Sequence, residues 1–419
     1  MQLLSFDIAV IGGGAAGLCA AAAAAGMGKK TLVIERSERA GGVLLQCIHS
    51  GFGLHFFNEE LTGPEYAERV LHAAENSGAE ILLSSSVMKI KKCQERFELD
   101  VFSGIHGVLK ISAAAVIFAA GCRERCRGNL GIPGVRTAGV FNAGFAQQLL
   151  NTEGYLPGRR AVIIGSGDIG LIMARRLAWS GVDVQCVVEI MPYPAGLSRN
   201  IAQCLEDFNI PLLLEHTVVS INGKERVRSI TIAPHSNGIP QMEQAREILC
   251  DTLLFSVGLV PENELLLECG AKINPLTGGA IVDGRLMTSV PGVFACGNGL
   301  HVHDLVDFVS REAERCAGSA AAYCDGKTAA AAQIAVVPGD GVRYVIPNFI
   351  SGNQENTFYL RSSRVLDKAV LKIVSGAGKV LMNKELRYVK PAEMLSAVLP
   401  AGAAGNDVSR IGIFLEECK

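Results

Sequence analysis

The sequence lacks paired cysteines. Its 13 cysteines are spread singly along 419 residues, and no two are three positions apart, so there is no CxxC motif. Zinc fingers and iron–sulfur clusters need grouped thiolates, so both are excluded and no metal is predicted. A basic N-terminal region with a cleavage site is also missing. These absences predict a reducing, cytoplasmic location rather than a disulfide-stapled secreted fold.

An excess of charge of one sign is missing as well. Lys and Arg total 39 against 41 for Asp and Glu, and no basic tract stands out. This balance excludes nucleic acid or an anionic membrane as the main partner. The composition is globular, with 49% hydrophobic residues. Because one core usually stops growing at roughly 250 to 300 residues, two or three domains are expected.

An uninterrupted apolar run long enough to cross a membrane is also missing. Residues 8–27 are apolar, but glycines stand at positions 12, 13, 14 and 17 in the first half of the run. The glycines fall where an apolar strand over 6–11 must turn into an Ala-rich helix over 15–25, before a second strand over 30–34. This order is the repeating unit of a parallel, doubly wound sheet, so no membrane span is predicted.

The first glycine-rich turn has the spacing of a dinucleotide site. Residues 12–17 are GGGAAG, which matches G-x-G-x-x-G between a strand and a helix. Gly12 allows the tight turn, Gly14 lets the backbone approach a pyrophosphate, and Gly17 lets the helix pack on the strand. The helix N-terminus offers N–H groups to the phosphates. Glu35 ends the second strand, where its carboxylate can accept hydrogen bonds from ribose hydroxyls.

A second turn repeats the pattern. Residues 165–170 are GSGDIG and lie between an apolar strand over 161–164 and a helix over 171–179. Glu189 ends the next strand, over 182–188. Its carboxylate would accept ribose hydroxyls and repel a 2′-phosphate, and no arginine follows before Arg199. NAD(H) is therefore predicted over NADP(H) at this turn.

The remaining pattern completes an α/β fold of two doubly wound, Rossmann-like domains with a small β-rich C-terminal module. Buried strands are expected over 251–258 and 292–297, and the Ala, Gly and Pro content of 325–340 is typical of a linker. Residues 369–374 and 380–389 flank a Gly-rich turn and predict a hairpin. Pro391 is expected to open a short helix.

Together these motifs resemble the pyridine nucleotide-disulfide oxidoreductase superfamily of flavoproteins, from Phe6 to about Cys324. Two further segments support the resemblance: VIFAAG at 116–121 and TSVPGVFACGN at 288–298. The resemblance implies a discontinuous FAD-binding domain over 1–125 and 285–328, an NAD-binding domain over 126–284, and the module over 340–419. The family usually has Gly-Asp at the end of the last segment, where the carboxylate binds the ribityl chain. Here Asn298 replaces the acid, and its amide can still form that hydrogen bond.

The resemblance also assigns binding residues one by one. The FAD-binding set is Gly12, Gly14, Ala15, Ala16, Gly17, Glu35, Arg36, Gly42, Val87, Ala120, Gly121, Gly297 and Asn298. The NAD-binding set is Gly165, Gly167, Asp168, Ile169, Gly170 and Glu189.

The redox dithiol of the disulfide reductases is absent. Lipoamide and glutathione reductases carry two cysteines five apart after a Gly-Gly pair, and this sequence has Leu44 and His49 there. The CxxC of thioredoxin reductases is absent too. A dithiol-dependent disulfide reductase is therefore not predicted.

Cys47 and His49 are the candidate catalytic residues, because they follow the Gly-Gly pair on the flavin side. A single catalytic cysteine occupies such a place in relatives that resemble NADH oxidase or coenzyme A-disulfide reductase. The alternative is a buried structural cysteine beside a hydrogen-bonded histidine. His301 and His303 are expected to open the helix that follows Asn298. They are two apart without further ligands, so they are predicted to tune the flavin or gate a partner rather than bind a metal.

Residues 41–53 and 165–200 more particularly resemble a subgroup found beside anaerobic-type glycerol-3-phosphate dehydrogenases and related to subunits of opine, sarcosine and hydrogen-cyanide-forming amino-acid dehydrogenases. This implies an FAD-dependent oxidoreductase that exchanges hydride with NAD(H) and electrons with a partner dehydrogenase subunit, in an oligomer. Two alternatives stay open. One is a stand-alone NADH oxidase or small-disulfide reductase that uses Cys47, and the other is a non-catalytic, flavin-binding redox sensor.

Overall fold

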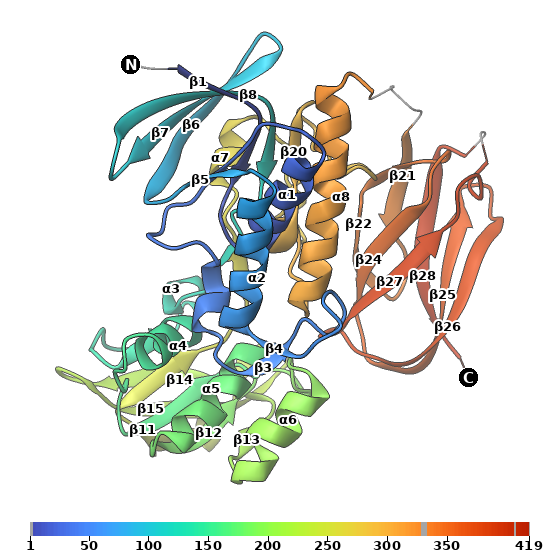
Figure 1. The fold of residues 1–419 in the computed structure, drawn as a ribbon. Coiled ribbons are helices and arrows are strands. Elements are labelled where there is room, and N and C mark those ends of the chain that lie inside the picture. The colour runs from blue at the N-terminus through green and yellow to red at the C-terminus, as the bar shows by residue number, and fades with distance from the viewer. Residues whose placement is uncertain (1–2, 328–332, 406–407, 419) are drawn as a thin grey trace. The chain divides into compact units, whose positions relative to one another are not determined.

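The computed structural model describes residues 3–327, 333–405 and 408–418. The chain divides into two compact units, one of residues 1–122 with 261–419 and one of residues 123–260. The chain enters the second unit through β9 (Cys122–Glu124) and leaves it through β19 (Leu259–Pro261). Figure 1 shows the elements of each unit by label.

The first unit is built on a sheet in the order β5-β2-β1-β8-β7-β6, with β20 paired to β8. Strands β1, β2, β5, β8 and β20 run parallel, and β6, β7 and β8 form an antiparallel meander. The strands are β1 (Leu3–Ile11), β2 (Thr31–Ile34), β5 (Glu80–Leu82), β6 (Ser85–Cys93), β7 (Arg96–Ser103), β8 (Gly107–Phe118) and β20 (Val293–Ala295).

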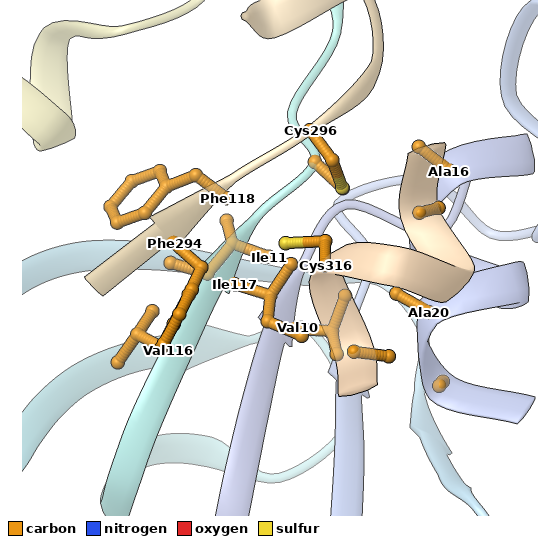
Figure 2. Packing of buried hydrophobic residues seen from close by; sticks show 14 of the residues in the cluster. Val10, Ile11, Ala16, Ala20, Val116, Ile117, Phe118, Phe294, Cys296 and Cys316 are labelled. Carbon is orange, nitrogen blue, oxygen red and sulfur yellow. The ribbon is translucent and has the colours of Figure 1, made fainter. Parts of the chain in front are cut away.

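Helices α1, α2 and α8 cover one side of this sheet, and α1 lies next to both α2 and α8 (Figure 1). Small side chains on α1 let the helices approach closely, and Figure 2 shows Val10 and Ile117 from the strands with Ala20 of α1 and Cys316 of α8. The helices and short elements are α1 (Ala15–Gly26), α2 (Gly63–Asn76), α7 (Glu264–Glu268), α8 (Val306–Cys324), the 3-10 helices η1 (Gly42–Gln46) and η4 (Gly297–Gly299), β3 (Ser50–Phe52) and β4 (Leu61–Thr62).

The second unit contains a parallel sheet in the order β10-β18-β11-β12-β13 and an antiparallel sheet of β14 to β17. Its strands are β10 (Val140–Asn142), β11 (Arg160–Ile164), β12 (Asp183–Val188), β13 (Leu212–Leu213), β14 (His216–Gly223), β15 (Val227–Ser236), β16 (Ile239–Pro240), β17 (Arg246–Leu249) and β18 (Thr252–Phe255). Its helices are α3 (Arg127–Leu130), α4 (Ala143–Asn151), α5 (Asp168–Trp179), α6 (Ser198–Cys204), η2 (Glu206–Phe208) and η3 (Met242–Gln244).

The C-terminal module groups with the first unit and has its own apolar core between two sheets, β23-β21-β28-β25-β26 and β22-β24-β27. Its strands are β21 (Gln333–Pro338), β22 (Val342–Ile346), β23 (Phe349–Ser351), β24 (Asn356–Ser362), β25 (Leu366–Ser375), β26 (Val380–Val389), β27 (Met394–Leu399) and β28 (Arg410–Glu417).

The α/β fold with Rossmann-like sheets and a β-rich C-terminal region is confirmed, and β25 with β26 forms the predicted hairpin. Two local predictions are wrong. Part of the predicted linker forms β21, because its alternating apolar residues pair with β28, while 328–332 lie outside the described residues. The segment after Pro391 forms a turn that leads into β27 rather than a helix.

Residues 261–284, which the sequence assigns to the nicotinamide domain, group with the first unit. The reason is apolar packing: Leu266, Ala280 and Val282 are buried in the core of that unit. Within the described part of the chain, no helix has the length and apolar character to cross a membrane.

Candidate functional site

The first glycine-rich turn leaves an open cradle at the N-terminus of α1. A Cβ at Gly12 would lie 2.5 Å from the Ala119 carbonyl oxygen, and one at Gly17 would lie 1.8 Å from the Gly12 carbonyl oxygen, so packing requires glycine at both. At Gly14 a Cβ would meet nothing within 4 Å. Gly14 is the N-cap of α1, and no side chain caps the helix. This open, uncapped end fits a pyrophosphate.

Glu35 lies beside this cradle at the end of β2 and is buried. Its Oε2 accepts a hydrogen bond from the Gly13 N–H at 2.6 Å, and its Oε1 accepts one from the Ser37 N–H at 2.8 Å. Each carboxylate oxygen keeps a further lone pair for a ribose hydroxyl. Of the predicted neighbours, Arg36 is exposed, whereas Val87 is half-buried in β6, two residues beyond Ser85, whose N–H donates to the Glu35 carbonyl at 2.8 Å.

Segments distant in the sequence meet at the same turn. Gly42 lies so close that its Cβ would be 3.1 Å from the Gly14 Cα, and Gly41 N–H donates to the Gly13 carbonyl at 2.8 Å. Gly297 has a φ of +69°, and a Cβ there would lie 2.8 Å from the Ala16 Cβ. Residues 288–298, here called the closing motif, therefore pack through Gly297 directly on the first glycine-rich turn.

The residues that follow β8 also lie beside the first glycine-rich turn. A Cβ at Gly12 would lie 3.1 Å from the Ala120 Cα, and one at Gly299 would lie 3.3 Å from the Gly121 carbonyl oxygen. The structure thus brings together the predicted FAD residues of the first turn, β2, η1, β8 and η4. Arg36 directly follows Glu35, and its side chain is exposed.

A buried polar cluster of His301, His303 and Glu312 lies directly after the closing motif. Glu312 of α8 accepts a hydrogen bond from the Gly297 N–H at 2.7 Å and one from His301 Nε2 at 2.8 Å. His303 Nε2 lies 3.2 Å from the same carboxylate, and the His303 N–H donates to Asn298 Oδ1 at 3.0 Å. The cluster therefore ties α8 to both residues of the Gly297-Asn298 pair.

The charges of this cluster follow from burial and hydrogen bonding. Burial alone would raise the pKa of Glu312, but His303 and His301 outweigh it, so the pKa of Glu312 lies well below its usual value. Burial lowers the pKa of His301 from its ordinary value. A neutral imidazole thus donates to an ionised carboxylate.

The prediction that His301 and His303 have no further metal ligand nearby is wrong, because Glu312 lies beside both. One ligand atom each from His301, His303 and Glu312 lies within 4.8 Å of the others, which is a spacing that could hold a metal ion. Glu312 could not be recognised from the sequence, because an acid on a helix 11 positions from His301 is ordinary. The prediction that the histidines open the helix is also wrong: they precede it, and α8 begins at Val306.

The start of α8 holds another acid that the sequence analysis missed. Asp307 is buried, and its carboxylate accepts hydrogen bonds from the backbone N–H groups of Gly53, His55 and Phe56, at 3.2, 3.1 and 2.8 Å. A carboxylate in the first helical turn is also favoured by the helix dipole. Asp307 therefore fixes the loop that follows β3.

Cys47 and His49 directly follow η1, which ends at Gln46. The Cys47 thiol donates to the Val43 carbonyl at 3.3 Å, and burial raises its pKa to about 12. The His49 ring lies 5.0 Å from Phe52, with Nδ1 2.9 Å from the Ser50 carbonyl oxygen. At neutral pH Cys47 is a protonated thiol rather than a thiolate nucleophile.

The second glycine-rich turn, in the second unit, repeats the geometry of the first. Gly165 has a φ of +87°, and a Cβ there would lie 2.2 Å from the Ser256 carbonyl oxygen. Gly170 N–H donates to Ser256 Oγ at 3.0 Å. Glu189 is buried at the end of β12, and its Oε2 accepts hydrogen bonds from Ser166 N–H and Oγ at 2.9 and 2.6 Å. A buried acid again lies beside a helix N-terminus whose cap, Gly167, has no side chain.

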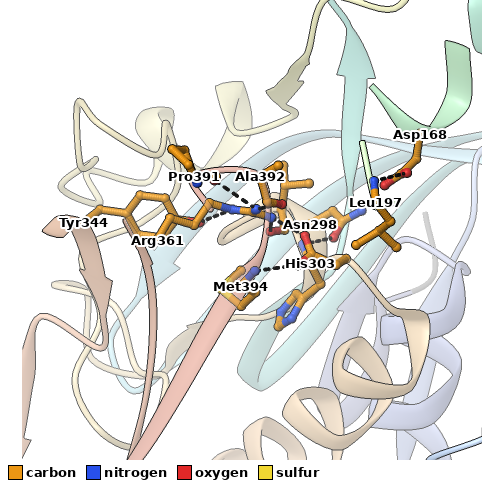
Figure 3. Close-up of polar contacts among 11 residues, drawn as sticks. Asp168, Leu197, Asn298, His303, Tyr344, Arg361, Pro391, Ala392 and Met394 are labelled. Carbon is orange, nitrogen blue, oxygen red and sulfur yellow. Dashed lines mark hydrogen bonds and ion pairs between the residues drawn. The ribbon is translucent and has the colours of Figure 1, made fainter. Parts of the chain in front are cut away.

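Asp168 opens α5 and faces a neighbouring loop. Its Oδ1 accepts hydrogen bonds from Leu197 N–H at 2.8 Å, shown in Figure 3, and from Asn200 Nδ2 at 2.6 Å. Ser166 Oγ accepts one from Ala195 N–H at 2.8 Å. Of the predicted nicotinamide-side residues, Asp168 thus positions the loop, and Ile169 is partly buried on α5 against the apolar core.

Comparisons with known proteins agree with this architecture. The family model described as pyridine nucleotide-disulphide oxidoreductase matches residues 6–321. Hydrogen cyanide synthase subunit HcnB of Pseudomonas protegens is 28% identical over 293 residues, which are 65% of this chain and 60% of that protein. Thioredoxin reductase of Treponema pallidum is 27% identical over 297 residues, which are 70% of this chain and 88% of that protein.

A solved structure shows the same arrangement. The crystal structure of T. acidophilum thioredoxin reductase covers 77% of this chain and 99% of its own, with 26% identity and a TM-score of 0.64. The match of the family model extends over both glycine-rich turns and residues 288–298. This family uses FAD and a pyridine nucleotide. The protein is an FAD-dependent oxidoreductase of the thioredoxin reductase-like class, and the chain belongs to the pyridine nucleotide-disulphide oxidoreductase family.

Proposed function

We propose that this chain is a free-standing NADH-dependent flavoprotein oxidoreductase that passes electrons from FAD directly to a small acceptor such as oxygen. The observation that carries the proposal is the repeated site: two helix N-termini without a side-chain cap, each with a buried glutamate beside it. FAD held at the first turn would take a hydride equivalent from the nicotinamide and return two electrons to the acceptor.

The residues of this chain have separate tasks in the proposal. The α1 N-terminus and Gly14 bind the FAD pyrophosphate, Glu35 binds its ribose, and Asn298 binds the ribityl chain. The α5 N-terminus and Glu189 do the same for the NAD pyrophosphate and ribose. With oxygen as acceptor, NADH, a proton and O2 give NAD⁺ and hydrogen peroxide.

The acceptor follows from the thiols. The sequence has no CxxC to pass electrons to a large disulfide substrate. Cys47 is held protonated, so thiolate attack on a small disulfide is disfavoured. Direct oxidation of the flavin needs neither group. The lack of any CxxC spacing in the sequence supports a reducing, cytoplasmic location for the chain.

The test is turnover of the purified, FAD-loaded protein with NADH in air. We expect NADH oxidation and hydrogen peroxide in a 1:1 ratio without any added protein. Turnover that appears only after a partner dehydrogenase is added would refute the free-standing form of the proposal.

Glu189→Ala should reduce the preference for NADH over NADPH. The Glu189 carboxylate repels a 2′-phosphate, and its removal should raise kcat/KM for NADPH by about tenfold and lower that for NADH. Steady-state kinetics with both nucleotides measure this ratio. Arg199→Ala, a change of an exposed residue at the start of α6, is the control and should leave NADH kinetics unchanged. A wild type without preference would show that Glu189 does not select the nucleotide.

Cys47→Ser should leave the oxidase activity within about twofold of wild type, because a protonated, hydrogen-bonded thiol is not the electron outlet in this proposal. Peroxide formation under saturating NADH is the measurement. A loss of activity of a hundredfold or more, with FAD still bound, would instead establish Cys47 as the redox group of a small-disulfide or peroxide reductase.

A second candidate function is the electron-transfer subunit of a larger dehydrogenase, of the glycerol-3-phosphate or amino-acid type. It is favoured by the similarity to HcnB, which is itself a synthase subunit, although this chain spans only 60% of that protein's length. Affinity purification from the native host distinguishes the two: co-elution with a second dehydrogenase chain supports the subunit function. A redox-sensor role would be supported only if NADH fails to reduce the bound flavin.

A further inference from the structure

The C-terminal module reaches back to the segment that follows Asn298. Strand β24 places Tyr359 and Arg361, two residues apart and hence on one face, against this segment. The ring of Tyr359 lies 5.5 Å from those of both His301 and His303. Tyr359 of the C-terminal module therefore packs against both imidazole rings.

Arg361 makes the main polar connection. Its Nη2 pairs with Asp304 Oδ1 and donates to the Val302 carbonyl at 3.1 Å, and its Nε donates to Tyr344 Oη at 3.2 Å. The side chains of Arg361 and Asp304 are only 12% and 16% exposed. Figure 3 shows the guanidinium between Tyr344 on one side and Ala392, whose carbonyl also accepts from it, on the other.

Strand β27 also binds Asp304. The Met394 N–H, at the start of β27, donates to Asp304 Oδ2 at 2.6 Å. Both oxygens of Asp304 are therefore bonded by the module. A carboxylate held by a buried guanidinium and a backbone N–H has little freedom to move.

The segment is held from the opposite side by α8. Glu312 bonds His301 and the Gly297 N–H, and the His303 N–H donates to Asn298 Oδ1. Residues 301–304 therefore lie between Glu312 of α8 and Arg361 of β24. A displacement of Asp304 would be passed to the amide of Asn298, because the adjacent residue His303 donates its N–H to Asn298 Oδ1.

We propose that the C-terminal module is a structural part of the FAD site, in which Arg361 is a positioning residue that holds Asp304 and thereby orients the Asn298 amide toward the flavin. The inference rests on the proposed role of Asn298 in binding FAD. The C-terminal module would then have a structural role within this chain, because its strands β24 and β27 hold residues 301–304, which follow Asn298.

The test measures the FAD dissociation constant of the full-length protein by titration of the flavin-depleted form, together with the unfolding temperature. Arg361→Met, which keeps the aliphatic length, should raise the Kd at least tenfold. Asp304→Asn, nearly isosteric, should do the same without a large loss of stability. The matched control is Arg364→Met on the same module, because Arg364 pairs with Asp340 at the surface, with side chains 47% and 74% exposed. Its Kd should stay within twofold.

The double variant shows whether the two residues act through their contact. Arg361→Met with Asp304→Asn should weaken FAD no more than either single change, because both remove the same connection. Arg361→Lys should recover part of the affinity. An unchanged FAD Kd in Arg361→Met and Asp304→Asn, whatever their unfolding temperatures, would overturn the inference while leaving the proposed oxidoreductase function intact. Failure of the wild type to bind FAD would instead refute the proposed function itself.

Discussion

Gly14→Ala is expected to remove tight FAD binding while the protein stays folded. Within the chain, a Cβ at Gly14 meets nothing within 4 Å, and the backbone there is extended at a φ of −80°, which alanine adopts freely. The added methyl would occupy only the space where the pyrophosphate must approach the N-terminus of α1. We therefore expect the FAD Kd to rise by about a hundredfold, or about 2.7 kcal/mol.

Gly26→Ala is the matched control, because it adds the same methyl to open space on the same helix. It should leave FAD binding unchanged and stabilise the protein by about 0.5 to 1 kcal/mol, since alanine is a better helix former than glycine. Flavin content after gel filtration and fluorescence titration give both results. A Gly14→Ala protein that keeps wild-type FAD affinity would place the pyrophosphate elsewhere.

Glu312→Gln is expected to destabilise the protein by about 3 kcal/mol and to weaken FAD retention. The buried carboxylate accepts hydrogen bonds from Gly297 and His301 and lies 3.2 Å from His303. A glutamine would turn N–H groups toward one of these donors and leave it unpaired. An unsatisfied buried polar group typically costs about 1 to 3 kcal/mol, and hydrogen bonds to a charged group cost more to lose. Urea unfolding at pH 7 measures the loss. Glu314→Gln, an exposed position on the same helix, should change stability by less than about 0.5 kcal/mol.

The pH dependence of this difference has a defined sign. The pKa of Glu312 is lowered in the folded state, so its contribution is fully present above its ordinary value of 4.5 and is lost as the pH falls through the folded value. The stability gap between wild type and Glu312→Gln should therefore shrink below pH 4.5. The pKa of His301 is lowered too, so wild-type stability should begin to fall once the pH drops below 6.5, where the unfolded histidine binds a proton. A gap that grows on acidification would contradict the ionised state of Glu312.

The parts of the site that can be predicted from the sequence are those whose residues lie close together along the chain. A strand, a G-x-G-x-x-G turn, a helix and a closing acid lie within about 25 residues, so residues 12–35 and 165–189 reveal both turns and both buried glutamates. The steric need for glycine at Gly12 and Gly17 is likewise a property of the turn. The hairpin of β25 and β26 is visible for the same reason, because its turn and alternation are adjacent.

Contacts between distant segments were not predictable. Glu312 and Asp307 look like ordinary helix acids, and only the packing of α8 shows that one binds Gly297 and the other holds the loop at Gly53. Arg361 and Asp304 are separated by 57 positions, and no local pattern links a strand of the C-terminal module to the flavin motif. Composition was also misleading for β21, where strand pairing outweighs an Ala-rich and Pro-rich context.

Hydride transfer from nicotinamide to flavin can be measured by anaerobic reduction of the FAD-loaded protein with NADH in a stopped-flow spectrophotometer. We expect the visible absorbance of the oxidised flavin to bleach completely with one equivalent of NADH, and much more slowly in Glu189→Ala. Bound FAD that neither NADH nor NADPH reduces would contradict the central claim that this chain transfers a hydride from nicotinamide to flavin.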